Sequence, residues 1–171
     1  MPIRVSENLE RRRLEIERCI RRAFKGVRRG PVSWSKAEAI DGNASSHEMY
    51  EAGARDTDTC WQDLLQSKSW TPHSNVGGWF FLDAMARRYY LPAAMIWCMN
   101  FGDADGIETG VGLVEELSRQ QSGAVAAFVL WMRDYSDWMY AKARKQSPGL
   151  PRVDSMNPWR SMFRDRWREF A

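Results

Sequence analysis

The sequence has few of the side chains that build metal sites, disulfide frameworks or catalytic centres. It contains three cysteines and two histidines in 171 residues. Cys19, Cys60 and Cys98 are too few and too scattered for a disulfide framework or a zinc knuckle. No pair of cysteine or histidine residues has the spacing of a metal site. We therefore expect a reduced protein that binds no metal and needs no cofactor.

Other signatures are missing as well. No apolar run approaches the roughly 18 residues that a membrane-spanning helix needs, and no apolar core follows the Arg-rich start at 1–13. No Gly-rich loop continues into the Lys-Ser or Lys-Thr of a phosphate site, and no serine lies in a nucleophile elbow. Carboxylate pairs such as Glu115 and Glu116 lack the ligand pattern of a calcium loop. The sequence predicts a cytoplasmic protein with no membrane segment and no recognisable catalytic constellation.

The charged residues are unevenly distributed along the chain. Lys and Arg total 25 against 22 Asp and Glu, so the net charge is only +3. Residues 1–30 carry a net charge of +6 and residues 141–171 one of +5, whereas residues 31–140 carry −8. The near-neutral total therefore hides basic ends and an acidic middle. Such segregation can attract partners of opposite charge or attach the ends to the middle.

Apolar residues at helical spacing predict that most of the chain is helical. A first amphipathic helix of about five turns follows Ser6 as its N-cap. A Ser-x-x-Glu box at Ser35 predicts a short helix, and Asp58 predicts the cap of another. A Ser-x-x-Gln box at Ser118 predicts the longest helix, near 119–145.

Aromatic residues interrupt this pattern near 79–91. Two aromatic runs at 79–83 and 88–91 are separated by four residues, which is typical of short strands joined by a turn. The two prolines and one glycine in residues 146–156 predict a linker to a C-terminal helix that begins at Asn157. The predicted fold class is mainly α within α+β: a single globular domain over 1–171, with five or six helices around one core and a small antiparallel β-hairpin.

Large apolar side chains on these elements are expected to form the core. We interpret the tryptophans in the same way, as core residues and not as a cofactor-binding motif. Five residues are specifically expected to be buried: Trp61, Phe81, Leu91, Phe128 and Trp131.

Several motifs occur in a characteristic order and spacing. They are Asp58-x-x-Trp61, Phe81-Leu82-Asp83, Arg88-Tyr89-Tyr90-Leu91-Pro92-Ala93 and Leu117-Ser118-x-x-Gln121, followed by Ala126, Ala127 and Phe128. Together they resemble a bacterial family of uncharacterised proteins, catalogued as a domain of unknown function, over about residues 16–140. The chain departs from the family pattern at the predicted hairpin turn, where Met85-Ala86 stands in place of a glycine. The resemblance implies no established activity, but small proteins of similar kind often resemble immunity proteins encoded beside toxin genes.

We interpret the chain as a non-catalytic protein-binding module, most concretely an immunity protein that binds and neutralises a cognate toxin. Many toxin domains that act on nucleic acids are basic, so an acidic surface could cover them and speed encounter. The candidate partner-binding residues are the acidic side chains of the middle segment with one aromatic anchor: Asp41, Glu48, Tyr50, Glu51, Asp56, Asp58 and Asp63.

Two alternatives stay open. One is a nucleic-acid-binding protein that uses the basic face of the first helix, although the near-neutral charge and the lack of a recognised motif argue against it. Its candidate residues are Arg11, Arg18, Arg22, Lys25 and Arg29. The other is an enzyme with a site near the predicted hairpin, formed by Asp83, Arg88, Tyr89 and Tyr90. The sequence identifies neither the partner nor the oligomeric state.

Overall fold

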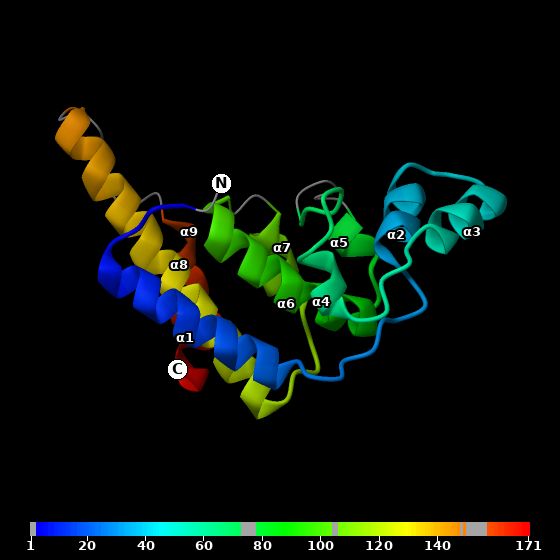
Figure 1. Ribbon diagram of the computed structural model, residues 1–171, viewed down its shortest axis with the longest axis horizontal. Helices are drawn as coiled ribbons and strands as arrows, with labels where there is room; N and C mark the ends of the chain where they lie inside the picture. The colour runs from blue at the N-terminus through cyan, green and yellow to red at the C-terminus, as the bar shows by residue number, and fades with distance from the viewer. Residues whose placement is uncertain (1–2, 73–77, 104–105, 148, 150–156) are drawn as a thin grey trace. The chain divides into compact units, whose positions relative to one another are not determined.

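The computed structural model describes residues 3–72, 78–103, 106–147, 149 and 157–171, and none of these residues lies in a β-strand (Figure 1). The predicted α+β fold class is therefore wrong: the described chain is helical. Its helices are α1 (Glu7–Ala23), α2 (Trp34–Asp41), α3 (Ser46–Ala54), α4 (Trp61–Leu64), α5 (Gly78–Phe81), α6 (Ala84–Phe101), α7 (Ile107–Leu113), α8 (Arg119–Gln146) and α9 (Pro158–Met162), followed by the π-helical turn η2 (Phe163–Trp167) and the 3-10 turn η3 (Arg168–Phe170).

The segment predicted as a β-hairpin, 79–91, forms most of α5 and the first half of α6. The carboxylate of Asp83 accepts a hydrogen bond from the backbone N–H of Ala86 at 2.9 Å and so caps α6. The buried side chains recur at helical intervals: Trp79, Leu82, Ala86, Tyr89 and Tyr90. This period prevails over the β-propensity of aromatic residues, because burial on one face of a helix contributes more than intrinsic preference.

Four of the five residues expected in the core are buried: Trp61, Leu91, Phe128 and Trp131. The fifth, Phe81, is 40 % exposed, so that prediction is wrong. The exposure of Phe81 follows from the helical structure of this segment. Phe81 ends α5 on a different helical face from the buried Trp79 and Leu82.

The other elements confirm some predictions and correct others. Ser118 and Gln121 form the expected capping box at the start of α8, which ends at Gln146. Asn157 accepts a hydrogen bond from the N–H of Trp159 and caps α9 as predicted. Helices α3 and α7 have no counterpart among the helices predicted from the sequence. Most of the predicted linker at 146–156 lies outside the described residues.

The chain folds into two compact units. The first, here called the central unit, is Phe24–Leu117; the second, the terminal unit, combines Ile3–Ala23 with Ser118–Ala171. The terminal unit has 17 Lys and Arg against nine Asp and Glu, and the central unit has eight against 13. The fold thus unites residues 3–23 of the basic N-terminal end with the basic C-terminal end in one unit, while Lys25, Arg28 and Arg29 fall in the central unit. That residues 1–171 form a single domain stays a prediction.

In the terminal unit, α1 lies along the long helix α8 (Figure 1). The indole N–H of Trp131 donates a hydrogen bond to the carbonyl of Leu9 at 2.9 Å. Arg12 and Asp134 form an ion pair at 2.7 Å between the same two helices. The buried residues of α1 are Leu9, Ile16 and Ile20, and burial of this apolar face stabilises the association of α1 with α8 together with the two polar contacts.

In the central unit, aromatic side chains from α2, α5, α6 and the segment after α4 form a buried cluster. Trp34 is its centre, with ring centroids 5.6 Å from Trp70 and 5.3 Å from both Trp79 and Tyr90. These tilted and edge-on contacts are favourable for aromatic rings. None of the described helices has the length and apolar composition needed to cross a membrane.

Candidate functional site

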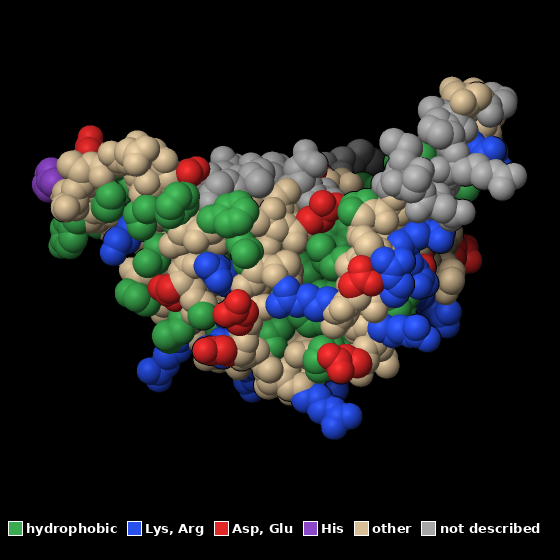
Figure 2. All heavy atoms as spheres, turned by 180° about the vertical axis from the view of Figure 1, so that it is seen from behind, with side chains coloured by type: hydrophobic (Ala, Val, Ile, Leu, Met, Phe, Trp, Pro, Cys, Tyr) green, Lys and Arg blue, Asp and Glu red, His purple; other side chains and the backbone are tan. Residues whose placement is uncertain are grey.

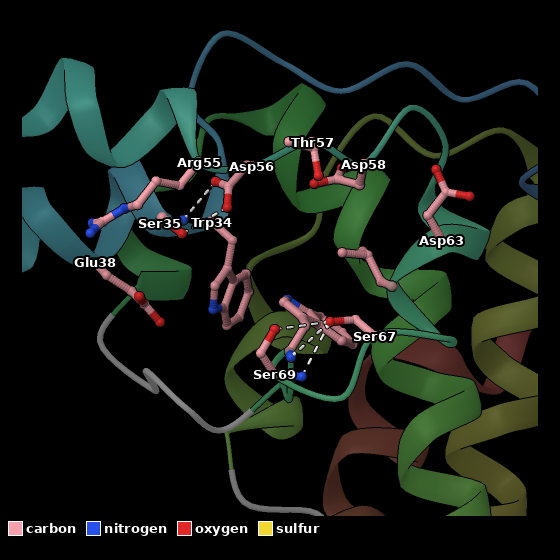
Figure 3. A pocket seen from close by; sticks show the side chains of 12 residues that line it. Trp34, Ser35, Glu38, Arg55, Asp56, Thr57, Asp58, Asp63, Ser67 and Ser69 are labelled. Atoms are coloured by element: carbon pink, nitrogen blue, oxygen red, sulfur yellow. Dashed lines mark hydrogen bonds between the residues drawn. The ribbon is translucent and has the colours of Figure 1, made fainter.

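A pocket of about 740 Å³ opens on the surface of the central unit. Figure 3 shows the indole of Trp34 projecting from α2 into this hollow, with Asp56 and Asp58 on one side and Ser67 and Ser69 on the other. The described residues that line the pocket include four carboxylates and a single arginine, Arg55. The lining is therefore acidic and polar over a floor of buried tryptophan.

Three of the seven predicted partner-binding residues meet at this pocket: Asp56, Asp58 and Asp63. Each is also an acceptor for hydrogen bonds within the fold. Their carboxylates therefore have two roles, since the side chains that give the pocket its charge also hold its walls.

Asp56 holds the start of α2. Its carboxylate accepts hydrogen bonds from the backbone N–H of Ser35 at 2.9 Å and from the Ser35 hydroxyl at 2.7 Å. The N-cap of α2 is Ser33, whose side chain makes no capping bond. The predicted capping box at Ser35 is therefore wrong: a carboxylate from a distant segment supplies the acceptor that this helix start needs.

Asp58 connects two other parts of the central unit. Its carboxylate lies 3.0 Å from the Arg29 guanidinium and accepts a hydrogen bond from the Tyr89 hydroxyl at 2.7 Å. The Asp58 side chain is only 10 % exposed. It was predicted to cap α4, but the N-cap of α4 is Cys60. Asp58 is therefore an internal anchor whose charge is compensated by Arg29.

Asp63 stabilises the start of α4. Its carboxylate accepts hydrogen bonds from the backbone N–H groups of Thr59 at 2.8 Å and Cys60 at 3.1 Å. These bonds favour the charged form and lower the pKa of Asp63 to about 2. The carboxylate is therefore ionised throughout the physiological pH range.

The other four predicted residues lie on α2 and α3 and are exposed. Glu48 forms a capping box with Ser45 at the start of α3, and hydrogen bonds from the Ser45 hydroxyl and N–H lower the pKa of Glu48. Tyr50 is 75 % exposed, and Glu51 lies 3.4 Å from His47. Asp41 is the last residue of α2. The only buried residue of α3 is Ala52, so this helix presents most of its side chains to solvent.

The residues of the alternative enzyme site are engaged in structural hydrogen bonds. Besides capping α6, the Asp83 carboxylate accepts a hydrogen bond from the N–H of Val32 at 3.3 Å. The Arg88 guanidinium donates to the carbonyl of Glu116 at 3.1 Å. Tyr89 and Tyr90 are buried. The Tyr90 hydroxyl accepts a hydrogen bond from the backbone N–H of Trp34 at 2.9 Å.

The two buried tyrosines predict a loss of stability at alkaline pH. Burial raises the pKa of both hydroxyls, and the Asp58 carboxylate raises each further. Because an unfolded tyrosine ionises near pH 10, the stability that these neutral groups provide is complete below about pH 10 and is lost as the pH rises above it. Between pH 10 and pH 11, we expect the free energy of unfolding of Tyr89→Phe to fall by about 1 kcal/mol less than that of the parent. Urea denaturation at the two pH values measures both changes.

Tyr50→Phe is the matched control for this experiment, because its hydroxyl is exposed in the folded protein. The buried thiol of Cys98, whose pKa burial also raises, contributes equally to all three proteins. Identical pH dependence of the parent and Tyr89→Phe would contradict the assignment.

The predicted basic face divides between the two units. Arg11, Arg18 and Arg22 are exposed on α1 in the terminal unit. Lys25 follows the end of α1, and Arg29 belongs to the central unit, where it is bound to the buried carboxylate described above. The stripe of five cations predicted from the sequence is therefore reduced to three.

Sequence reasoning assigned none of the other residues that line the pocket to a binding site, among them Trp34, Glu38 and Trp70. The i, i+4 spacing of the first two could have indicated a shared helix face. No local pattern places the third beside them. Among the described residues, no three His, Cys, Asp or Glu side chains lie together in a way that could hold a metal ion.

Comparison with known proteins gives one result. No curated protein and no solved structure matches the chain significantly. A family model matches residues 12–129, which are more than half of the sequence and include α2, the pocket and the start of α8. The chain belongs to a family of unknown function, DUF6714.

Proposed function

We propose that this chain is a non-catalytic protein-binding module of the bacterial cytoplasm, and most concretely an immunity protein that neutralises a basic toxin. The observation that supports this best is the pocket on the central unit. Carboxylates that are scattered over residues 38–63 of the sequence line one hollow there, around Trp34. Among the described residues that line this hollow, Arg55 is the one positively charged side chain.

This chemistry suits a lysine or arginine side chain of a partner protein. Carboxylate oxygens accept charge-assisted hydrogen bonds from guanidinium and ammonium groups. An indole ring attracts a cation that lies over its face within about 6 Å. The pocket combines both kinds of group, so we propose that it receives a basic side chain of the partner.

Helix α3 extends the proposed interface beyond the pocket. Its C-cap is Arg55, which lines the pocket, and the helix carries Tyr50 with Glu48 and Glu51. Tyrosine is enriched among the residues that dominate binding energy at interfaces, and acidic residues at a rim accelerate association with a basic partner. Tyr50 is thus the proposed anchor, and the two glutamates supply long-range attraction.

The test is binding to the product of the adjacent gene, measured by biolayer interferometry over a range of salt concentrations. We expect the double variant Asp41→Lys/Glu51→Lys to reduce the association rate at low salt about tenfold or more, because rim charges act mainly on encounter. Neither carboxylate is buried, so the thermal stability of the free protein should stay close to that of the parent.

Glu115→Lys/Glu116→Lys is the matched control, since it changes the charge of the central unit equally at exposed residues that do not line the pocket. Its association rate should change much less. Equal effects of the two double variants, or unaltered salt dependence of Asp41→Lys/Glu51→Lys, would remove the acidic surface as the interface. If the parent does not bind the product of the adjacent gene, that product is not its partner.

A further inference from the structure

The terminal unit has a strong excess of positive charge that the proposed interface does not use. The basic C-terminal end and residues 3–23 of the N-terminal end belong to this unit, and its segments carry a net charge of +8. In Figure 2 the densest group of Lys and Arg side chains lies on the right of the view, and others are scattered over the rest of this face. Three arginines near the C-terminus, Arg164, Arg166 and Arg168, line a hollow of about 440 Å³, but Asp165 pairs with Arg164 at 2.6 Å. The carboxylates there reduce the charge available to a ligand.

The arginines of helix α1 are arranged more regularly than those near the C-terminus. Its residues Leu9, Ile16 and Ile20 are buried, while the exposed arginines fall on the opposite face. Arg11, Arg18 and Arg22 are separated by seven and four residues. At 100° per residue they lie within about 40° of one another, and they span roughly 16 Å of the helix axis. They form an aligned row, here called the arginine row.

Among the described residues, no ion pair joins the arginine row to a carboxylate, although Glu7 and Glu15 lie on the same face of α1, four residues before and after Arg11. Arg11 donates a hydrogen bond to Asn8 at 3.0 Å, and Arg18 donates to the carbonyl of Leu14 at 3.2 Å. Both acceptors are neutral. Other arginines of α1 differ in this respect: Arg13 pairs with Glu10 at 2.6 Å. The helix thus pairs some of its arginines directly with carboxylates and leaves the arginines of the row without such an ion pair among the described residues.

We propose that the arginine row is a binding surface for the phosphate backbone of duplex nucleic acid. A duplex presents one phosphate per 3.4 Å of axis on each strand, so the length of the row matches about five phosphates. Arginine binds phosphate oxygens through paired N–H groups, which favours it over lysine in this role. Such contacts carry no base information, so the binding is independent of sequence.

Two features of α1 favour nucleic acid over an anionic membrane. A helix that lies in a membrane surface inserts an apolar face, but the apolar face of α1 is buried within the terminal unit. Among the described residues of α1, Leu14 is the only large apolar side chain that is exposed. This surface lies on a different unit from the proposed toxin interface, so the two proposals are independent.

The probe is a fluorescein-labelled 20-base-pair DNA duplex, titrated with the full chain and followed by fluorescence anisotropy from 50 to 200 mM NaCl. Three phosphate contacts predict a slope of log affinity against log salt of about −2.7, which is about a 40-fold loss over this range. We expect Arg11→Gln/Arg18→Gln/Arg22→Gln to bind at least about tenfold more weakly at 50 mM NaCl and to lose most of this slope. Glutamine preserves helix propensity, and circular dichroism verifies the fold.

The control variant is Arg144→Gln/Lys145→Gln/Arg168→Gln, which removes the same charge from exposed and scattered positions of the terminal unit. Its affinity should stay within about twofold of the parent, with the slope retained. Equal weakening of both variants would show that net charge and not the row drives binding, and would overturn the proposal. So would the absence of DNA binding by the parent, or preferential binding to vesicles containing phosphatidylserine.

Discussion

Replacement of Trp131 by alanine is expected to lower the free energy of unfolding by about 3–5 kcal/mol. Trp131 is fully buried in the terminal unit and stacks on Tyr135 with ring centroids 5.1 Å apart. Its indole N–H also donates to the carbonyl of Leu9, so the substitution removes both packing and a hydrogen bond between α1 and α8. Urea denaturation monitored by circular dichroism measures the loss.

Two further variants separate these contributions. Trp131→Phe retains an aromatic ring but loses the hydrogen bond, so we expect a smaller loss than for alanine. Trp138, on the same helix, is only partly buried, and Trp138→Ala should cost clearly less than Trp131→Ala. A midpoint for Trp131→Ala that matches the parent would contradict the packing of α1 on α8.

Replacement of Asp58 by alanine is expected to destabilise the protein by about 2–4 kcal/mol. The substitution leaves the Arg29 guanidinium without its carboxylate and the Tyr89 hydroxyl without its acceptor. Removing one member of a buried ion pair is strongly unfavourable, because the remaining charge stays partly desolvated. The partial exposure of Arg29 places the expected value below that of a fully buried pair. Equilibrium unfolding in urea gives the value.

Glu51→Ala is the control, because its carboxylate is 63 % exposed and its neighbour His47 is exposed too. We expect a change within about 0.5 kcal/mol. A double-mutant cycle of Asp58→Ala with Tyr89→Phe then measures how much of the loss passes through the hydroxyl. If Asp58→Ala is as mild as Glu51→Ala, Asp58 is not an internal anchor.

Sequence reasoning was most successful where local chemistry decides the structure. The capping box at Ser118 and Gln121 and the Asn-Pro start at Asn157 both occur where predicted. In each case a side chain satisfies backbone N–H groups three residues away or less, so neighbouring residues carry all the information.

The errors arise where distant segments decide. The aromatic run at 79–91 was assigned to strands by propensity, whereas its burial within the central unit selects helix. Ser35 had the right neighbours for a capping box, but Asp56 takes its hydrogen bonds. No local pattern reports that a carboxylate 21 residues away will arrive at this helix start.

The candidate site was predicted in part. Charge identified Asp56, Asp58 and Asp63, and the fold gathers them at one pocket. Charge alone could not distinguish these anchored carboxylates from the exposed ones on α3, because the distinction depends on partners such as Arg29 that are distant in sequence. The tertiary contacts therefore determine which carboxylates are anchored, and composition alone does not show this.

The double role of the pocket carboxylates has a consequence for divergence within the family. Asp56 and Asp58 can change only together with the residues that they hold, so Ser35 and Arg29 should covary with them. Helix α3 has no such constraint beyond its single buried residue, Ala52. Homologues that face different partners are therefore expected to differ mainly along α3, with the floor of the pocket kept constant beneath it.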